Sequence, residues 1–231
     1  MSQHEPEAVV ITGGTGGLGQ AVSLRLAAAG YACHITSRNE AEQQELRDAA
    51  PPGAVMHFHE VDVTDETQVG AMFAGIEGTV QFHGLVHLVG GFEMGPVDGT
   101  TLHVWDRLMR INATSAFICC REAAARMKPR QSGRIVTVSA RAVLEPPARM
   151  AAYLASKAAV LALTQSLARE LKDEGITVNT ILPSVIDTPA NRRAMPGADP
   201  ARWIPPGRIA DAILLLLGPD AAGITGAALP L

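Results

Sequence analysis

The stretch Thr12-Gly-Gly-Thr-Gly-Gly-Leu-Gly19 joins a short apolar run, Ala8–Thr12, to an Ala- and Leu-rich segment over residues 18–29. A glycine turn between a strand and a helix lets backbone N–H groups approach a pyrophosphate without interference from Cβ atoms. The first N–H groups of the helix add a partial positive charge at the same place. The stretch therefore predicts a dinucleotide site, and a glycine-rich turn without a ligand is the simpler alternative.

Two registers of this glycine loop fit a dinucleotide-binding pattern. They are Gly14-x-Gly16-x-x-Gly19 and Thr12-Gly13-x-x-x-Gly17-x-Gly19. The residues predicted to contact the cofactor here are Gly13, Thr15, Gly16, Gly17, Leu18 and Gly19.

Short β-branched runs alternate with longer helical patterns along the chain, which predicts a parallel sheet with helices on both faces. The expected strands are Ala8–Thr12, Ala32–Thr36, 55–61, 85–89, 134–139, 177–182 and 227–229. The expected helical segments include 18–29, 68–76, 105–127, 151–171 and 209–217. No repeat or linker interrupts the series, so we expect one doubly wound, Rossmann-type α/β domain of about seven strands over residues 1–231. The longest loops, 142–149 and 189–206, follow late strands, where such sheets place substrate pockets.

Composition and charge exclude several kinds of partner. Aromatic residues make up 4% of the chain and the net charge is −4, without a run of Lys or Arg, so we expect no nucleic-acid partner. The polar, acidic N-terminus does not resemble a signal peptide, and no stretch approaches the ~18 apolar residues of a membrane span. The three cysteines fit neither a disulfide framework nor a metal-ligand spacing. We therefore expect a cytoplasmic protein with buried thiols, no metal site and no membrane partner.

The end of the second expected strand indicates which dinucleotide binds. An acidic residue there, ~20 residues beyond the glycines, would bond the ribose 2′-hydroxyl of NAD and repel a 2′-phosphate. This chain has Ser37 and Arg38 instead, a hydroxyl and a guanidinium that suit a phosphate. We therefore favour NADP(H) over NAD(H), with a solvated loop charge as the alternative for Arg38. Asp62 and Val63 end the third strand, from which Asp62 either reaches the adenine amino group or caps the next helix.

Tyr153 and Lys157 lie four residues apart at the start of an Ala-rich helical segment. Residues with this spacing share a helix face, so the phenol and the ammonium address one site. A free tyrosine has a pKa near ~10, and a nearby cation lowers that pKa because it favours the phenolate. The pair therefore predicts acid–base chemistry at neutral pH, although the spacing alone is common in helices.

Motifs along nearly the whole chain together resemble those of the short-chain dehydrogenase/reductase family. They comprise the loop 12–19, residues 62–63, 105–112, 133–139, the pair Tyr153 and Lys157, residues 178–179 and 183–188. The resemblance implies that Tyr153 donates the proton and that Asn112 holds a water in a proton relay. It implies that Lys157 lowers the pKa of the phenol and binds the nicotinamide ribose. The further cofactor contacts that it implies are Asp62, Val63, Gly90, Pro183, Ile186 and Thr188.

Several positions depart from the family's pattern. Where the family has Asn-Asn-Ala-Gly after the fourth strand, this chain has His87-Leu-Val-Gly90, which keeps the glycine and loses the asparagines. We expect His87 to be a packed histidine rather than a ligand or base. Ser184 replaces the glycine that usually follows the position of Pro183.

The family's catalytic serine falls on Ala140 when it is counted back thirteen positions from Tyr153, and Ser139 lies one place early. Adjacent strand residues point to opposite faces, so we expect Ser139 to face away from the substrate. An inserted or deleted loop residue would return Ser139 to the catalytic role. Loss of one such donor costs on the order of 10²–10³ in rate, unless the substrate does not need it.

A narrower resemblance, to dihydropteridine reductases, covers residues 140–205. It rests on residues 140–142, 150–153, the run 186–199, Trp203 and Pro205. It implies a quinonoid dihydropterin substrate, reduced with Tyr and Lys and without a serine. Those enzymes prefer NADH and carry an acidic residue where this chain has Ser37, so a generic carbonyl reductase is an equal alternative.

The sequence therefore predicts an oxidoreductase that transfers hydride from NADPH to a small C=O or C=N substrate. The segment 189–206 is expected to close a substrate pocket whose walls include Ala140, Met195 and Trp203. Alternatives of other classes are a cofactor-sensing protein that has lost catalysis and a nucleic-acid-binding protein. The missing serine motivates the sensor, and the retained Tyr153, Lys157 and Asn112 oppose it.

The expected helices 105–127 and 151–171 resemble those that pair between family subunits. Small residues on the second helix allow close approach, so we expect a homodimer or homotetramer; packing inside the same subunit is the alternative. These residues are Ala151, Ala155, Ala158 and Ala162.

Overall fold

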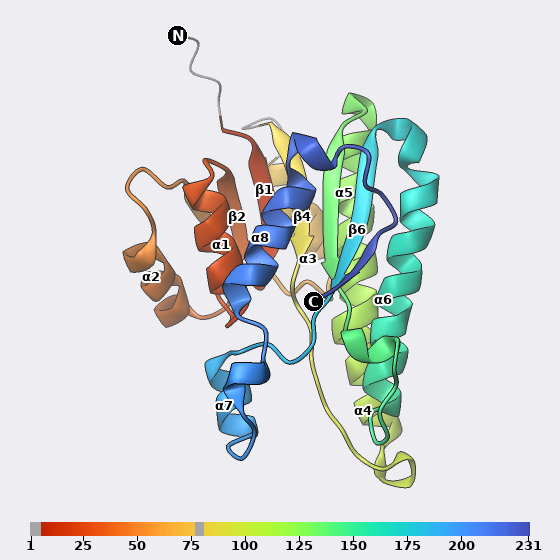
Figure 1. The fold of residues 1–231 in the computed structure, drawn as a ribbon. Helices are drawn as coiled ribbons and strands as arrows, with labels where there is room; N and C mark the ends of the chain where they lie inside the picture. Colours follow the sequence, from red (N-terminus) through yellow and green to blue (C-terminus); the bar gives the residue numbers. More distant parts are fainter. Residues whose placement is uncertain (1–5, 77–80) are drawn as a thin grey trace.

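The computed structural model describes residues 6–76 and 81–231 and contains one seven-stranded sheet flanked by helices (Figure 1). All neighbouring strands are parallel, in the order β3-β2-β1-β4-β5-β6-β7. The strands are β1 Ala8–Thr12, β2 Ala32–Thr36, β3 Met56–His59, β4 Phe82–His87, β5 Gly133–Val138, β6 Ile176–Leu182 and β7 Ala228–Pro230. This arrangement confirms the predicted doubly wound α/β fold.

Helices cover both faces of the sheet, as Figure 1 shows. The α-helices are α1 Gly19–Ala28, α2 Glu40–Ala49, α3 Glu66–Ile76, α4 Leu102–Leu108, α5 Ser115–Met127, α6 Ala151–Glu170, α7 Pro189–Ala194 and α8 Pro206–Leu217. A π-helical segment, Met109–Thr114, joins α4 to α5. One core contains apolar residues of α3, α5 and α6, and the other contains residues of α1, α2 and α8.

The strand order reverses at β1, which pairs with β2 on one side and with β4 on the other. In open α/β sheets this switch point opens a crevice at the carboxyl ends of the strands, where ligands bind. In Figure 1 the chain enters β1 from the top, so these ends point down, towards α7 and α4. The fold therefore directs the glycine loop after β1 and the segment after β4 to the same crevice.

Two expected elements differ from the structure near this crevice. The fourth strand is β4, Phe82–His87, instead of 85–89, because pairing with β1 ends at Thr12 and His87. Beyond this point the N–H of Leu88 is shared between the carbonyl oxygen and Oγ1 of Thr12, and the N–H of Val89 donates to Thr12 Oγ1. The expected helix 105–127 is interrupted by the π-helical segment.

Other boundaries are also corrected. The third strand is shorter than the expected 55–61, and α2 is a further helix, of which Leu46 is the only buried residue. The expected loop 189–206 contains α7, which begins with Pro189 after the Thr188 side chain accepts the N–H of Asn191. A proline in the first helical turn and a threonine cap are both favourable helix starts.

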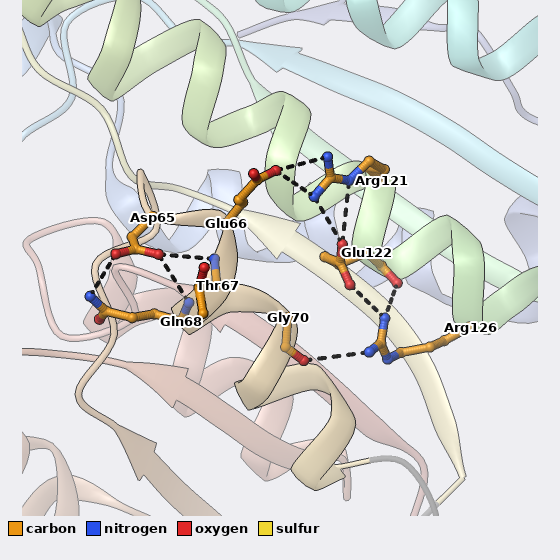
Figure 2. A network of polar contacts seen from close by, with 8 residues as sticks. All are labelled: Asp65, Glu66, Thr67, Gln68, Gly70, Arg121, Glu122 and Arg126. Atoms are coloured by element: carbon orange, nitrogen blue, oxygen red, sulfur yellow. Dashed lines mark hydrogen bonds and ion pairs between the residues drawn. The ribbon is translucent and has the colours of Figure 1, made fainter.

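Polar contacts join α3 to α5 on the outer surface (Figure 2). Arg121 on α5 contacts Glu66 on α3 at 3.2 Å and its neighbour Glu122 at 3.1 Å. Arg126 binds Glu122 at 2.8 Å and donates to the carbonyl of Gly70. The exposed pair of Arg121 with Glu66 contributes only about 0–1 kcal/mol, so the apolar core beneath supplies most of the packing between these helices.

The small-residue face of α6 is accessible in the protomer. Ala151, Ala158 and Ala162 are exposed, and Ala155 is half-buried. Three of the four alanines thus lack full cover inside the protomer. Pairing of these helices between subunits stays a prediction.

Three histidines stack on the edge of the sheet. His34 of β2 faces His57 of the edge strand β3 in register, with ring centroids 4.7 Å apart. His34 Nδ1 lies 3.0 Å from His59 Nε2. Burial, followed by the charges of His57 and His59, lowers the pKa of His34 to about 4. The cluster therefore disfavours the imidazolium form.

We expect this cluster to make the fold sensitive to acid. The pKa of His34 is about 4 in the folded protein and ~6.5 in an unfolded chain. The unfolded chain therefore binds the proton first, so the contribution is complete above pH ~6.5 and is lost as the pH falls towards ~4, by up to about 3 kcal/mol. His34→Phe, which keeps a planar ring beside His57, should reduce the pH dependence of the free energy of unfolding measured by urea denaturation. Equal slopes in the two proteins would contradict this assignment.

Among residues 6–76 and 81–231, no helix has both the length and the apolar character needed to cross a membrane.

Candidate active site

The loop after β1 is built for close backbone approach. Gly13 has φ +67°, and a Cβ atom added at Gly19 would lie 2.1 Å from the carbonyl oxygen of Gly13. The residue before α1 is Leu18, whose side chain does not cap the helix, and the first turn that follows is uncharged. The partial positive charge of this helix start is therefore not neutralised by a side chain and suits an anionic group of a ligand.

The segment after β6 lies against this loop. A Cβ atom at Gly17 would lie 2.9 Å from Thr188 Cγ2, so the structure brings these two predicted cofactor residues together. Ile186 bridges to Ile204 and its carbonyl accepts from Asn191 Nδ2. These contacts hold the segment after Pro183 beside the glycine loop.

The end of β2 meets the glycine loop at Ser37. Its Oγ lies 3.0 Å from Thr15 Oγ1, and the serine is buried. Arg38 is exposed, yet it lies near enough to Asp62 to help lower the pKa of that carboxyl. The two hydrogen bonds from Thr64 to Asp62 lower that pKa more strongly.

Of the two predicted roles of Asp62, helix cap or adenine contact, the structure tests the helix cap. Asp65, and not Asp62, caps α3, because Asp65 Oδ1 accepts the N–H groups of Thr67 and Gln68. Val63 is buried in the core between the helices α3 and α5 and the sheet. Contact of Asp62 with adenine stays a prediction.

Three consecutive residues after β4 contact the predicted catalytic residues. A Cβ atom at Gly90 would lie 2.8 Å from Asn112 Oδ1 and 3.0 Å from Lys157 Nζ. The N–H of Gly91 donates to Asn112 Oδ1 at 2.8 Å, and its carbonyl accepts from Asn112 Nδ2 at 3.0 Å. The ring of Phe92 packs edge-on against that of Tyr153, with centroids 4.9 Å apart. One loop therefore brings together residues from the π-helical segment and from α6.

Burial, rather than a neighbouring cation, sets the pKa of both members of the tyrosine–lysine pair. Desolvation raises the pKa of Tyr153 to about 12 and lowers that of Lys157 to about 8. The role of Lys157 in lowering the pKa of Tyr153, which the family resemblance implies, stays a prediction. The Lys157 ammonium donates to the carbonyl of Val138 at 2.9 Å. At neutral pH, Tyr153 is a neutral phenol that can donate a proton.

Asn112 is buried and fully engaged by its neighbours. Besides its two bonds with Gly91, its Nδ2 donates to Ser156 Oγ at 2.9 Å. Ser156 in turn donates to the carbonyl of Tyr153 at 2.7 Å. Sequence reasoning missed Ser156, although its position between Tyr153 and Lys157 on the helix was a usable signal.

Ser139 points into the main chain of α6. Its Oγ donates to the carbonyl of Lys157 at 2.7 Å, and the side chain is buried. Ala140, also buried, has an extended backbone, so the two side chains project from opposite sides of the chain. This geometry supports the interpretation that position 140 corresponds to the family's serine, because the Ser139 hydroxyl hydrogen is already used.

His87 is a packed histidine, as expected. Its Nδ1 lies 3.0 Å from Thr12 Oγ1 and its Nε2 lies 3.1 Å from Ser115 Oγ. Ser115 donates to the carbonyl of Ile111, so Nε2 carries the hydrogen and Nδ1 accepts from Thr12. Burial, and then the charge of Lys157, lowers the pKa of His87 to about 3. His87 is therefore a neutral link between β1, β4 and the start of α5.

The remaining predictions concern the substrate side and the cysteines. Met195, at the end of α7, is 36% exposed and Trp203 is half-buried, so both side chains are partly available to a ligand. Phe92, which sequence reasoning missed, is 56% exposed next to Tyr153. The three cysteines are buried free thiols, as expected, and burial raises the pKa of each; they are Cys33, Cys119 and Cys120.

Comparison with known proteins agrees with this geometry. Residues 7–198 match the family model of the short chain dehydrogenases. The chain is 29% identical to 2-(S)-hydroxypropyl-CoM dehydrogenase 3 of Xanthobacter autotrophicus, over 96% of this chain and 93% of that protein. It is 35% identical to the inactive 2-(S)-hydroxypropyl-CoM dehydrogenase 2 of the same organism, over 77% and 84% of the two chains.

The fold is also similar to solved structures. The crystal structure of levodione reductase superposes with a TM-score of 0.91 and 25% sequence identity, over 99% of this chain and 97% of that one. The family match covers most of the chain and includes the glycine loop, Asn112, Tyr153 and Lys157. The protein therefore belongs to the short-chain dehydrogenase/reductase family of oxidoreductases.

Proposed function

We propose that this protein transfers a hydride between a nicotinamide dinucleotide and the carbinol or carbonyl carbon of a small secondary alcohol or ketone. The observation that carries the proposal is the meeting of Tyr153, Lys157 and Asn112 with the loop 90–92 in the crevice after β4. The glycine loop and α1 fit a pyrophosphate, and Gly90 leaves the space that a side chain would fill beside Lys157. The names of two similar proteins support this proposal. One is a dehydrogenase of 2-(S)-hydroxypropyl-CoM, which is a secondary alcohol, and the other, levodione reductase, is named for the reverse type of reaction, a reduction.

The bound nicotinamide would supply or accept the hydride, and the protein would manage the proton. Tyr153 is a neutral phenol at neutral pH because burial raises its pKa to about 12, so it donates a proton to the carbonyl oxygen during reduction. Lys157, with its pKa lowered to about 8, remains mainly cationic at neutral pH and stabilises negative charge that develops on the phenol oxygen. Asn112 and Ser156 hold the start of α6 against the loop 90–92.

We propose NADP(H) as the preferred cofactor. Arg38 is the cation at the ribose end of the site, and position 37 carries a serine in place of a carboxylate. A guanidinium binds a phosphate through paired N–H donors, and it has no equivalent partner in a ribose hydroxyl.

A second candidate function is a cofactor-binding sensor with impaired catalysis. Ala140 favours it, because it removes a donor from the expected substrate oxygen site, and one relative at 35% identity is named as inactive. The buried contacts of Tyr153, Lys157 and Asn112 favour the enzyme. The narrower resemblance to dihydropteridine reductases stays a prediction and adds a quinonoid dihydropterin to the substrates worth testing.

A turnover assay separates these functions. We expect the purified chain to bind NADPH more tightly than NADH by fluorescence titration and to oxidise or reduce members of a panel of secondary alcohols, ketones and a quinonoid dihydropterin. Cofactor binding without turnover on the whole panel would favour the sensor. Binding of neither cofactor would overturn both functions.

A further inference from the structure

A carboxylate that the sequence did not single out lies at the ribose end of the proposed cofactor site. Thr15 Oγ1, in the glycine loop, donates a hydrogen bond of 2.8 Å to Glu42 Oε2. Glu42 is half-buried in the first turn of α2. Asn39 caps this helix by accepting the N–H groups of Ala41 and Glu42. The carboxylate is therefore presented to the loop by a well-formed helix start.

The hydroxyl hydrogens around this carboxylate are already used. Thr15 Oγ1 also lies 3.0 Å from Ser37 Oγ, at the end of β2. A hydroxyl has one hydrogen to donate, and a carboxylate only accepts. Thr15 gives its hydrogen to Glu42, and the hydrogen of Ser37 has two acceptors, Thr15 Oγ1 and the carbonyl of Asn39 at 3.4 Å. Both hydroxyl hydrogens therefore have acceptors within the protein, and that of Thr15 points to the Glu42 carboxylate.

This arrangement treats the two nicotinamide dinucleotides differently. The residue at the end of the second strand is the one that reads the ribose 2′ position in this fold. A 2′-phosphate placed there needs donors and avoids negative charge, and here it meets a carboxylate and two occupied hydroxyls. A 2′-hydroxyl has a hydrogen to donate and finds an acceptor in Glu42.

We propose that Glu42 is a cofactor-specificity residue, which weakens the binding of 2′-phosphorylated dinucleotides relative to that of NAD(H). The inference rests on the proposed function and deepens it. Arg38 and Glu42 act with opposite sign at one ribose: the guanidinium attracts the phosphate and the carboxylate repels it. The preference for NADP(H) is therefore smaller than Arg38 alone would produce.

The substitution Glu42→Gln tests this assignment, because it removes the charge and keeps both the size and an oxygen that accepts from Thr15. We expect the dissociation constant of NADPH to fall about tenfold, as the loss of one close like-charge repulsion allows, while that of NADH stays nearly unchanged. The matched control is Glu45→Gln, which removes the same charge from an exposed position of the same helix. It should leave the ratio of the two dissociation constants unchanged.

Calorimetric titration with two fragments locates the effect. Adenosine 2′,5′-bisphosphate should bind Glu42→Gln more tightly than the unmodified chain, and AMP should bind the two proteins equally. Equal changes for both fragments, or an unchanged ratio of NADPH to NADH affinity, would overturn the role of Glu42. Arg38→Ala should move the ratio in the opposite direction.

The inference and the proposed function fail in different ways. If the unmodified chain binds both cofactors and Glu42→Gln leaves their ratio unchanged, only the role of Glu42 is wrong. If the unmodified chain binds neither cofactor, the proposed function is wrong and the role of Glu42 falls with it.

Discussion

Tyr153→Phe should reduce turnover by about 10²–10⁴-fold, the range that a positioned general acid supplies, while cofactor affinity stays nearly unchanged. The variant removes only the phenolic hydroxyl and keeps the ring that packs edge-on against Phe92. The fold and the cofactor crevice should therefore be preserved. Steady-state kinetics on the best substrate of the panel, together with fluorescence titration of NADPH, measures the two quantities separately.

Lys157→Ala is the informative companion to this variant. Its ammonium is buried and donates to the Val138 carbonyl, next to Gly90. Its removal should reduce both turnover and cofactor affinity, because the family resemblance implies that Lys157 binds the nicotinamide ribose as well as serving Tyr153. Substantial turnover in Tyr153→Phe would show that the proton comes from another group. His87 is a poor candidate, because its pKa of about 3 and its two hydrogen bonds leave it neutral and occupied.

The parts of the site that the sequence predicted are those that depend on local patterns. The glycine loop follows a strand and precedes a helix, and the Tyr153–Lys157 spacing places both residues on one helix face. Both relations hold within about one turn of chain, so they are readable without knowledge of the fold. The sheet was predictable because its strands are nearly continuous apolar runs separated by helices.

The parts that the sequence did not predict depend on contacts between distant segments. Glu42 meets Thr15 only because α2 folds back beside the glycine loop, and Leu46 is the only buried residue of α2. The contact of Phe92 with Tyr153 depends on the path of the chain after β4. The raised pKa of Tyr153 results from desolvation by the folded protein, which no local sequence pattern indicates. Such tertiary effects leave no periodic signal in the sequence.

Position 140 is where the chain departs most sharply from its family, and Ala140→Ser should therefore have a large effect on turnover. Removing one donor from an oxyanion site costs on the order of 10²–10³ in rate. If the preferred substrate is an ordinary ketone, Ala140→Ser should recover part of this factor and raise kcat by about tenfold or more. The extended backbone at Ala140, on the opposite side of the chain from Ser139, is what gives the new hydroxyl a path to the substrate.

The response to Ala140→Ser also distinguishes the classes of substrate. A quinonoid dihydropterin, or another activated C=N acceptor, has less need of a donor at this oxygen site. For such a substrate the added hydroxyl should leave turnover unchanged or lower it, because position 140 is 5% exposed and has little room. Comparing kcat for a ketone and for the dihydropterin in the same variant therefore tests the narrower resemblance directly.

Ser139→Ala is the control that fixes the register. The Ser139 hydroxyl donates to the Lys157 carbonyl inside the protein, so its loss should cost about 1 kcal/mol of stability and leave turnover nearly unchanged. A large loss of turnover in Ser139→Ala, with the fold intact by circular dichroism, would mean that Ser139 is the family's serine after all. Ala140 would then not replace the catalytic serine, and no unusual substrate would be needed to explain it. The argument for a dihydropterin would lose its main support.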